Sequence, residues 1–342
     1  MTLQSSGQIA LSDLRTEYTN LGSQGQVAMN DFYYGSTHLK KNKCTDQART
    51  DSSHPTKASH FDNIPVLSTP RSQIRLTNFY GKVYYYARQS VVQVSGSNAS
   101  VNVVNIENES LKSNSNNTVF FDLETIGNCS GSTTSNFGLS IPQGNRANTT
   151  CYLTNDYAIY GKGGKGGNGG GSSAERGEDG GTALSVATNV YLKNNNRILG
   201  GGGGGGGSVA RRETYNECYC CRTTNASIAG SGGGGGKGGG GGGSAGFALG
   251  SNFMYAGANG SGGDSNISSV PGSGGSGGTR CSFNVVIGTY CSIPGGNGGG
   301  WGQAGGSSSA AGGAAGNAIR RRSGFYYVVL TSGTQAGSTV TF

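Results

Sequence analysis

The sequence has little charge, little proline and no long apolar segment. Of its 342 residues, 12% are charged, 33% are hydrophobic and 6 are Pro. A collagen triple helix is excluded, because it needs abundant proline as well as glycine at every third position. No apolar run approaches the roughly 18–20 residues of a membrane helix. The first residues, Met1–Ser6, also lack the basic and apolar parts of a signal peptide. We therefore expect a chain that is made in a cytosol and is not exported by that route.

The chain also lacks the signatures of common cofactor and metal sites. Lys162, Lys165 and Lys237 lie in glycine-rich segments, but each is followed by Gly instead of the Ser or Thr that a phosphate-binding loop requires. The three histidines lie in a polar segment near the N-terminus without a strong metal-ligand spacing. No carboxylate pair suited to acid–base catalysis stands out in residues 151–342. We therefore predict no enzymatic activity, no cofactor and no metal.

The positive charge is modest and scattered. The formal net charge is +8, and the densest basic cluster is Arg320–Arg322. A nucleic-acid-binding surface would combine a basic face with aromatic stacking partners. We therefore expect a solvated surface, drawn at most to an anionic partner, and predict no nucleic-acid binding.

Glycine is what the sequence has in excess, with 67 residues. One run is unbroken from Gly200 to Gly207, a second extends from Gly232 to Gly243 with only Lys237 inside it, and a third glycine-rich stretch begins at Gly161. Ordering one residue costs about 1–2 kcal/mol of backbone entropy, and glycine loses the most. The runs are therefore either flexible linkers or elements that neighbouring segments order.

Segments rich in aromatic and hydrophobic residues alternate with the glycine runs, at 208–231, 247–256, 279–294 and 318–330. A linker does not need such segments, whereas a packed scaffold with projecting loops does. Glycine in the polyproline-II conformation forms a helix of three residues per turn without internal hydrogen bonds. Parallel helices of this kind can bond to one another, because no side chain separates them. We therefore favour packed polyglycine-II helices over linkers.

An internal repeat leads into the glycine runs. Residues Tyr152–Gly161 align with Tyr191–Gly200, and both copies contain an Asn-rich centre followed by an Ile-x-Gly step. The pattern predicts equivalent strands stacked in layers, as in solenoid folds, with corner Asn side chains bonded to the backbone.

The N-terminal part reads differently. Three related eight-residue units begin at Gly7, Gly25 and Ser72, and each predicts a short strand followed by a capped turn. Residues 83–150 contain β-branched and aromatic runs, including Val101–Ile106, which predict the strands of a small sandwich-like or jelly-roll-like domain. The expected fold class is mainly β, in three parts: 1–82, 83–150 and 151–342.

The cysteines number 8. Disulfides that staple exposed loops, a zinc site of unusual spacing and free buried thiols are all compatible with their distribution. We predict disulfides, with a connectivity that the sequence does not determine. The candidates are Cys129, Cys151, Cys218, Cys220, Cys221, Cys281 and Cys291.

Aromatic and arginine residues between the glycine runs are candidates for a binding surface. Tyr and Trp offer a large rigid contact area with a polar group, although the same residues could fill gaps against glycine layers or between subunits. The candidates are Arg211, Arg212, Tyr215, Tyr219, Arg222, Phe253, Tyr255, Phe283, Tyr290 and Trp301.

Two parts of the sequence resemble proteins of bacteriophage tails. Residues Ser6–Glu17, echoed by Gly25–Tyr34, resemble the N-terminal attachment segment of tail-fibre and tail-tip proteins. The Asn-rich corner, the Ile-x-Gly step and the long glycine runs, ending in Gly312–Ile319, resemble the glycine-rich receptor-binding regions of phage adhesins.

The resemblance implies a non-enzymatic virion protein that attaches to other phage tail proteins through 1–82. Residues 83–150 would be a β-rich spacer. Residues 151–342 would form a polyglycine-II-like region whose loops bind a bacterial surface receptor, either lipopolysaccharide or an outer-membrane protein. The arginines would meet lipopolysaccharide phosphate through paired hydrogen bonds. The resemblance also implies a homotrimer.

Two other functions remain open. The chain could be a purely structural tail component that binds no receptor. More remotely, it could be an ice-binding protein of glycine helices, which would need regular small-residue repeats and a flat face instead of irregular aromatic segments.

Overall fold

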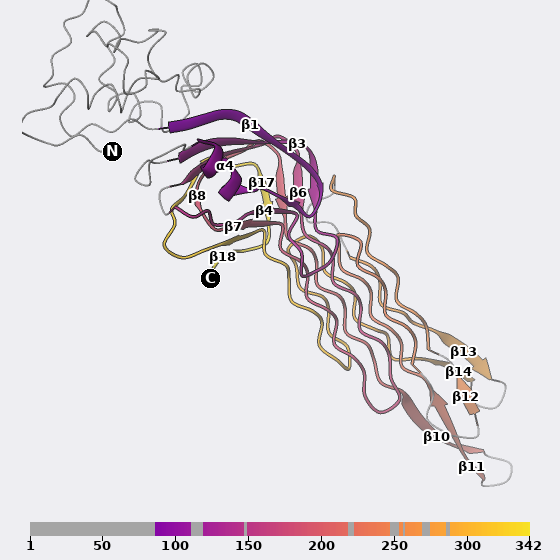
Figure 1. Ribbon diagram of the computed structural model, residues 1–342. Coiled ribbons are helices and arrows are strands. Elements are labelled where there is room, and N and C mark those ends of the chain that lie inside the picture. Colours follow the sequence, from indigo (N-terminus) through magenta and orange to yellow (C-terminus); the bar gives the residue numbers. More distant parts are fainter. Residues whose placement is uncertain are drawn as a thin grey trace, which may run out of the picture.

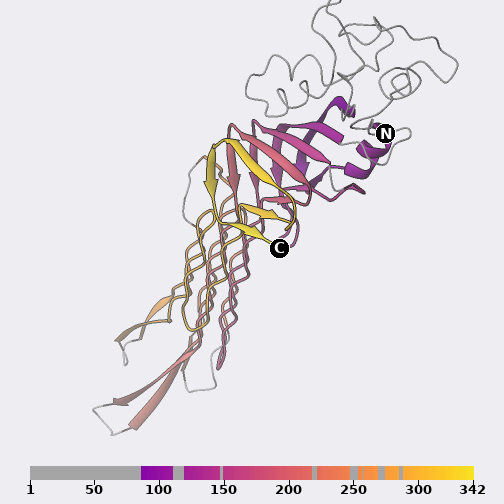
Figure 2. The same cartoon turned by 90° about the vertical axis from the view of Figure 1, so that its left-hand side faces the viewer.

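The computed structural model describes residues 86–110, 119–146, 149–217, 222–246, 253–255, 257–268, 274–284 and 288–342. The molecule is elongated, with stacked β-sheets at one end and glycine-rich segments that extend side by side from them (Figures 1 and 2). The predicted attachment repeats of residues 1–82 lie outside the described residues. No described helix is long and apolar enough to cross a membrane.

The sheets are built from successive turns of the chain that stack in parallel. An eight-stranded sheet and a five-stranded sheet contain only parallel pairs. The mainly β class predicted from the sequence is therefore confirmed. The larger sheet contains β1 (Tyr86–Ser97), β3 (Val119–Ser130), β5 (Thr150–Asn155), β6 (Ala158–Tyr160), β8 (Asn189–Asn194), β9 (Arg197–Leu199), β16 (Tyr327–Thr331) and β17 (Thr334–Ala336). The smaller sheet contains β2 (Ala99–Ser100), β4 (Leu139–Ile141), β7 (Leu184–Val186), β15 (Ile319–Arg321) and β18 (Thr339–Thr341).

We call each turn of the chain through the stacked sheets a rung. The two copies of the internal repeat occupy neighbouring rungs and pair in the predicted register. Tyr152 pairs with Tyr191, and Ile159 pairs with Ile198. This confirms that equivalent strands stack in layers. The glycine segments leave the stack after β6 and after β9, and the chain returns from them to β7 and β15.

The core lies between the two sheets and consists mainly of aliphatic residues, to which the last strands, β16–β18, add only the partly buried Tyr327. Leu123, Leu153, Leu184 and Ile198 are completely buried. At the corner, the Asn155 side chain accepts from Thr125 Oγ1 at 3.2 Å and donates to Asn194 Oδ1 at 2.7 Å. Buried polar groups need such partners because an unsatisfied one costs about 1–3 kcal/mol.

Residues 83–150 do not form the predicted sandwich. Their described strands belong to the same two sheets as strands from 158–199 and 319–341, and the predicted boundary at residue 150 falls at the first residue of β5. The expected strand at Val101–Ile106 is largely helical, because α4 extends over Val103–Ser110. Asn102 caps this helix by accepting from the Asn105 N–H at 2.9 Å, and Val103 and Ile106, three residues apart, face the core.

The segment 201–208 is entirely buried and is surrounded by six other segments of the same chain. Every third residue donates to the same neighbour, which is the period of a three-residue helical turn. Gly201, Gly204 and Gly207 donate to Gly181, Glu178 and Glu175; Gly202, Gly205 and Ser208 donate to Lys237, Gly234 and Ser231; Gly203 and Gly206 donate to Gln303 and Gly306. Its carbonyl groups accept from three further segments, 164–170, 296–299 and 310–316. The run is therefore a packed element and not a linker.

We call the bonded segments the glycine lattice; it comprises residues 161–183, 200–208, 230–246, 257–264, 274–278 and 295–316. A Cβ added at any position from Gly201 to Gly207 would lie 1.9–2.1 Å from a backbone oxygen of another segment. Since no orientation around this segment is free of a neighbour, every position must be Gly.

Segments at the surface of the glycine lattice carry side chains at a period of three. In 162–170, Lys162, Lys165 and Asn168 are each followed by two glycines. The glycines face other backbones, with an added Cβ on Gly164 lying 2.1 Å from Glu178 O, whereas Lys165 is exposed. A segment that is surrounded by more neighbouring segments therefore contains a larger share of glycine.

Candidate functional site

Five short strands lie at the end of the glycine lattice that is remote from the eight-stranded sheet (Figures 1 and 2). We call them the distal tip. They are β10 (Arg211–Glu217), β11 (Arg222–Ile228), β12 (Phe253–Tyr255), β13 (Cys281–Asn284) and β14 (Gly288–Cys291). β10 and β11 form an antiparallel hairpin to which β12 adds in parallel, and β13 and β14 form a second hairpin.

The structure brings most of the predicted binding residues to this tip. The three-stranded sheet contains Arg211, Arg212, Tyr215, Arg222, Phe253 and Tyr255. The second hairpin contains Phe283 and Tyr290.

The backbone register of the tip places residues from separate passes of the chain along the glycine lattice side by side. Tyr215 is paired with Thr224, and Tyr255 is paired with Ile228. The glycine-rich segment 230–246 separates β12 from the hairpin in the sequence, yet all three strands form one sheet. Arg211 is exposed at the start of β10. Tyr219 lies outside the described residues.

Trp301 does not belong to this surface. Only 1% of its area is exposed, and its indole Nε1 donates to the carbonyl oxygen of Asn266 at 3.2 Å. Its ring meets Tyr160 edge-on, with the centroids 5.6 Å apart. Because Tyr160 ends β6, the indole fills the junction between the sheets and the glycine lattice. Trp301 therefore packs in the interior, which was the alternative that the sequence left open.

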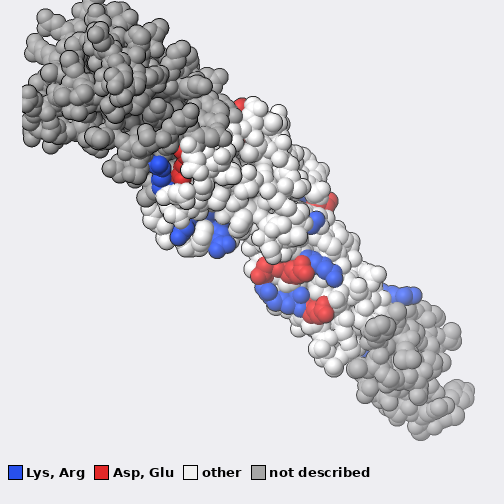
Figure 3. Space-filling view, viewed as in Figure 1, with Lys and Arg blue, Asp and Glu red and all other residues white. Residues whose placement is uncertain are grey.

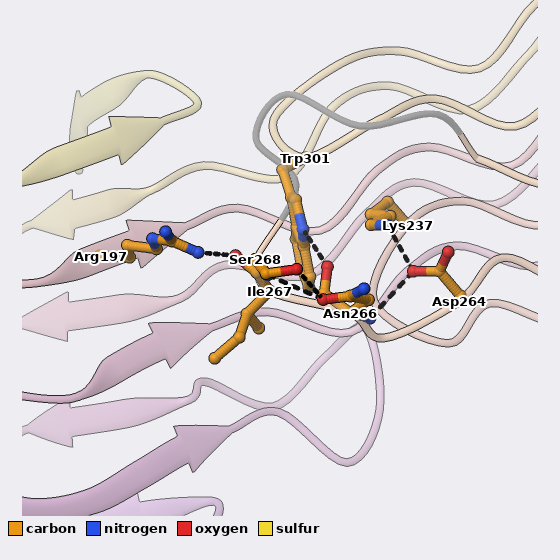
Figure 4. A network of polar contacts seen from close by, with 7 residues as sticks. All are labelled: Arg197, Lys237, Asp264, Asn266, Ile267, Ser268 and Trp301. Carbon is orange, nitrogen blue, oxygen red and sulfur yellow. Dashed lines mark hydrogen bonds and ion pairs between the residues drawn. The ribbon is translucent and has the colours of Figure 1, made fainter.

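The same junction contains a polar network that the sequence did not reveal (Figure 4). Lys237, with only 2% of its side chain exposed, forms an ion pair with Asp264. The backbone N–H groups of Gly238 and Gly239 donate to the Asp264 carbonyl at 2.9 and 3.2 Å. Lys237 is the one residue other than Gly between Gly232 and Gly243. This interruption of the glycine run is the sequence feature that could have indicated the network.

The network holds a turn of the chain against the sheets. Arg197 donates through Nη1 to the Ile267 carbonyl, and the Asn266 N–H donates to Asp264 Oδ1 at 2.9 Å. The hydrogen bond from Lys237 is the main cause that lowers the pKa of Asp264. The turn 264–268 is thereby fixed beside Trp301.

The cysteines divide into two groups. Cys129 and Cys151 are free and buried in the core, so the structure corrects their predicted role as disulfide partners. They lie on different rungs, with Cys129 paired with Ile159 and Cys151 paired with Phe121. Cys291 is disulfide-bonded, and its register partner in the second hairpin is Cys281. Cys218, Cys220 and Cys221 lie outside the described residues.

The surface in view is largely uncharged, and a mixed group of acidic and basic residues lies along the glycine lattice (Figure 3). Acidic side chains of 175–179 bind backbone groups of the lattice: Glu178 accepts from the Lys165 N–H at 3.2 Å, and Asp179 accepts from the Ala314 N–H at 2.7 Å. These carboxylates therefore satisfy backbone donors at the surface of the lattice. Among the described residues, no cluster of His, Cys, Asp and Glu could hold a metal ion.

The comparison with protein families agrees with the resemblance seen in the sequence. No curated protein matches the chain. Among solved structures, the crystal structure of the gp37-gp38 adhesin tip complex of the bacteriophage S16 long tail fiber is similar at 20% identity and a TM-score of 0.38, covering 83% of this chain and 92% of that chain. Residues 89–340 match the family described as phage tail fibre adhesin Gp38. Since this match covers well over half of the sequence, the chain belongs to the phage tail fibre adhesin Gp38 family.

Proposed function

We propose that this tail-fibre adhesin of the phage virion binds a bacterial surface receptor through its distal tip. The observation that carries the proposal is the position of β10–β14, at the end of a packed glycine lattice that separates them from the stacked sheets. Loops on a rigid scaffold are a frequent site of recognition.

The glycine lattice prepares the tip for binding. Its segments are held by backbone hydrogen bonds of 2.7–3.2 Å, including those between 201–208 and its neighbours. A surface that is already ordered loses less entropy on binding, and its affinity increases accordingly. The tip residues would therefore meet a receptor as a largely preformed surface.

The receptor is lipopolysaccharide or an outer-membrane protein. Arg211, Arg212 and Arg222 all lie on the β10–β11 hairpin, and guanidinium groups pair with phosphate through two parallel hydrogen bonds. The tyrosines supply rigid contact area with a hydroxyl group. Binding through the arginines would weaken as the salt concentration rises.

Residues 1–82 attach the chain to other phage tail proteins in this proposal, and the chain acts by binding without catalysis. The predicted homotrimer is not needed to complete the lattice, because all six neighbours of 201–208 come from the same chain. Light scattering of the purified chain will determine the number of subunits.

The proposal is tested by adsorption of the purified full chain to host cells and by its ability to block infection. Tyr215→Ala in the tip should weaken adsorption by about 30-fold, which is the effect of a typical hot-spot residue. Tyr157→Ala is the matched control, because Tyr157 is 44% exposed on the sheet region. Equal adsorption by both variants would contradict the tip as the binding site. Absence of adsorption by the wild-type chain would favour a purely structural tail component.

A further inference from the structure

The last rung of the sheet stack is open. β16 and β17 are the two ends of the eight-stranded sheet, and β18 is an end of the five-stranded sheet. All three belong to residues 327–341 and form the edge of the sheets opposite β1 (Figure 2). Each is hydrogen-bonded to one neighbouring strand only among the described residues. An edge strand presents unpaired N–H and C=O groups that can pair with another chain.

This rung is apolar as well as open. The exposed large hydrophobic residues of the described chain are six, and four of them lie here: Tyr326, Val328, Val329 and Phe342, with 38–48% of their areas exposed. Residues 323–342 contain no charged residue and no proline. β17 and β18 are protected by their length of three residues each. The five-residue β16 carries no charge and no proline, and the one protecting feature described for it is the register irregularity between Val329 and Thr331.

Arginines border the rung at β18. The guanidinium of Arg320 lies 4.0 Å from the centre of the Phe342 ring, and Arg321 Nε donates to Thr341 Oγ1 at 3.0 Å. Arg322 follows them and is exposed. Among the described residues, no carboxylate forms an ion pair with these three arginines. The open rung therefore has a positive border.

We propose that the open rung binds a β-strand of another tail protein, one that carries acidic side chains beside its pairing edge. The strand would extend the larger sheet at β16 or β17 by backbone hydrogen bonds. Its acidic groups would meet Arg320–Arg322. The inference rests on the proposed assembly of this chain into the tail and adds a second contact to the one through 1–82.

The positive border decides between a foreign partner and a second copy. In a twofold dimer the same surface meets itself, and residues 319–342 contain three arginines and no carboxylate, so both copies would bring only positive charge to the interface. Like charges at an interface are unfavourable. A partner of opposite charge satisfies both the apolar edge and its border.

The test uses phage particles assembled without this chain, to which the purified full-length chain is added. Val329→Lys should reduce the bound chain per particle at least about tenfold, because the lysine would be buried against the added strand. Arg320→Glu should have a similar effect, and Arg320→Lys should retain binding. Ile126→Lys is the control, because Ile126 is 47% exposed and Val329 is 48% exposed, but Ile126 lies on β3. Bound chain is measured by quantitative immunoblot after sedimentation of the particles.

Several outcomes would overturn the proposal. Wild-type binding by Val329→Lys would do so, as would equal losses for Val329→Lys and Ile126→Lys. A wild-type dimer that Val329→Lys converts into a monomer would assign the rung to self-association instead. Adsorption of each variant to host cells is measured in parallel: Val329→Lys should adsorb like the wild type, because the distal tip is unchanged. If the wild-type chain does not adsorb to host cells, the receptor function is contradicted. The rung proposal is not affected by that outcome, because it is tested separately by the binding of the rung variants to particles.

Discussion

Replacing Gly204 by alanine should disrupt the glycine lattice, whereas the same substitution at Gly241 should leave it intact. Both residues are in long glycine runs and neither has a positive φ. At Gly204 the added Cβ would lie 2.0 Å from the Lys165 oxygen and 2.4 Å from its carbonyl carbon. At exposed Gly241 the nearest atom would be Lys165 Cγ at 3.8 Å.

The cost at Gly204 follows from the movement that the methyl group requires. Ordinary contact begins at 3.4 Å, so the two segments must separate by about 1.4 Å, which is 3.4 minus 2.0. The hydrogen bonds that join them on either side, from Gly164 and Gly167 N–H groups, are both 2.8 Å long and would be broken. Two hydrogen bonds contribute about 1 kcal/mol each, and overpacking adds about 1–3 kcal/mol. The free energy of unfolding should therefore fall by about 3–5 kcal/mol.

Thermal unfolding of the full chain, followed by circular dichroism, measures the difference. A loss of about 3–5 kcal/mol lowers Tm by about 6–20 °C in a domain of this size. Gly241→Ala should leave Tm unchanged or raise it slightly, because alanine restricts the unfolded chain and stabilises by about 0.4–1 kcal/mol. Protease digestion of residues 200–243 gives a second measure, with faster cleavage expected only for Gly204→Ala. Equal Tm values and equal cleavage in the two variants would refute the packed lattice.

Three further predictions concern the junction and the core. Asp264→Asn should lower Tm at pH 7. Lys237 holds the pKa of this carboxyl below its usual value, so the stabilisation is present above an unfolded pKa of about 3.9 and is lost as the pH falls through the folded pKa. The Tm difference between wild type and variant should therefore shrink near pH 3, and a constant difference would contradict the ion pair. Burial raises the pKa of Cys129 to about 11 and that of Cys151 well above its usual value. Alkylation mapped by mass spectrometry should therefore modify both only after unfolding, and fast labelling of the native chain would exclude their burial. Asn155→Ala should lower the free energy of unfolding in urea by about 1–3 kcal/mol, because it leaves buried polar partners unsatisfied; an unchanged midpoint would show that the corner hydrogen bonds do not contribute.

Repetition in the sequence predicted the stacking. The two copies of Tyr-Leu…Ile-x-Gly lie on neighbouring rungs, with Tyr152 beside Tyr191. Identical patterns bury the same face when they stack in register, so the repeat determines both the strand positions and their alignment. The predicted packing of the glycine runs came from the aromatic and hydrophobic segments that alternate with them, which a flexible linker does not need.

Residues 101–106 and Trp301 show where local patterns were insufficient. The β-branched run at 101–106 is typical of a strand, yet Asn102 caps a helix there. The choice was made by the packing of Val103 and Ile106 into the core, which involves strands distant in the sequence. Trp301 was a candidate for the binding surface because of its large aromatic side chain, but Tyr160 and Asn266 contact it in the interior.

The sequence alone determined the mainly β class and the rung repeat and favoured packed glycine over linkers, since each of these depends on residue type and period along the chain. The tertiary structure decided which segments surround 201–208, why Lys237 is buried beside Asp264, and which aromatic residues lie at the distal tip and which lie inside. These depend on contacts between segments far apart in the chain. A glycine run carries no side chains that could specify its partners, so the identity of those partners is settled only when the whole lattice assembles.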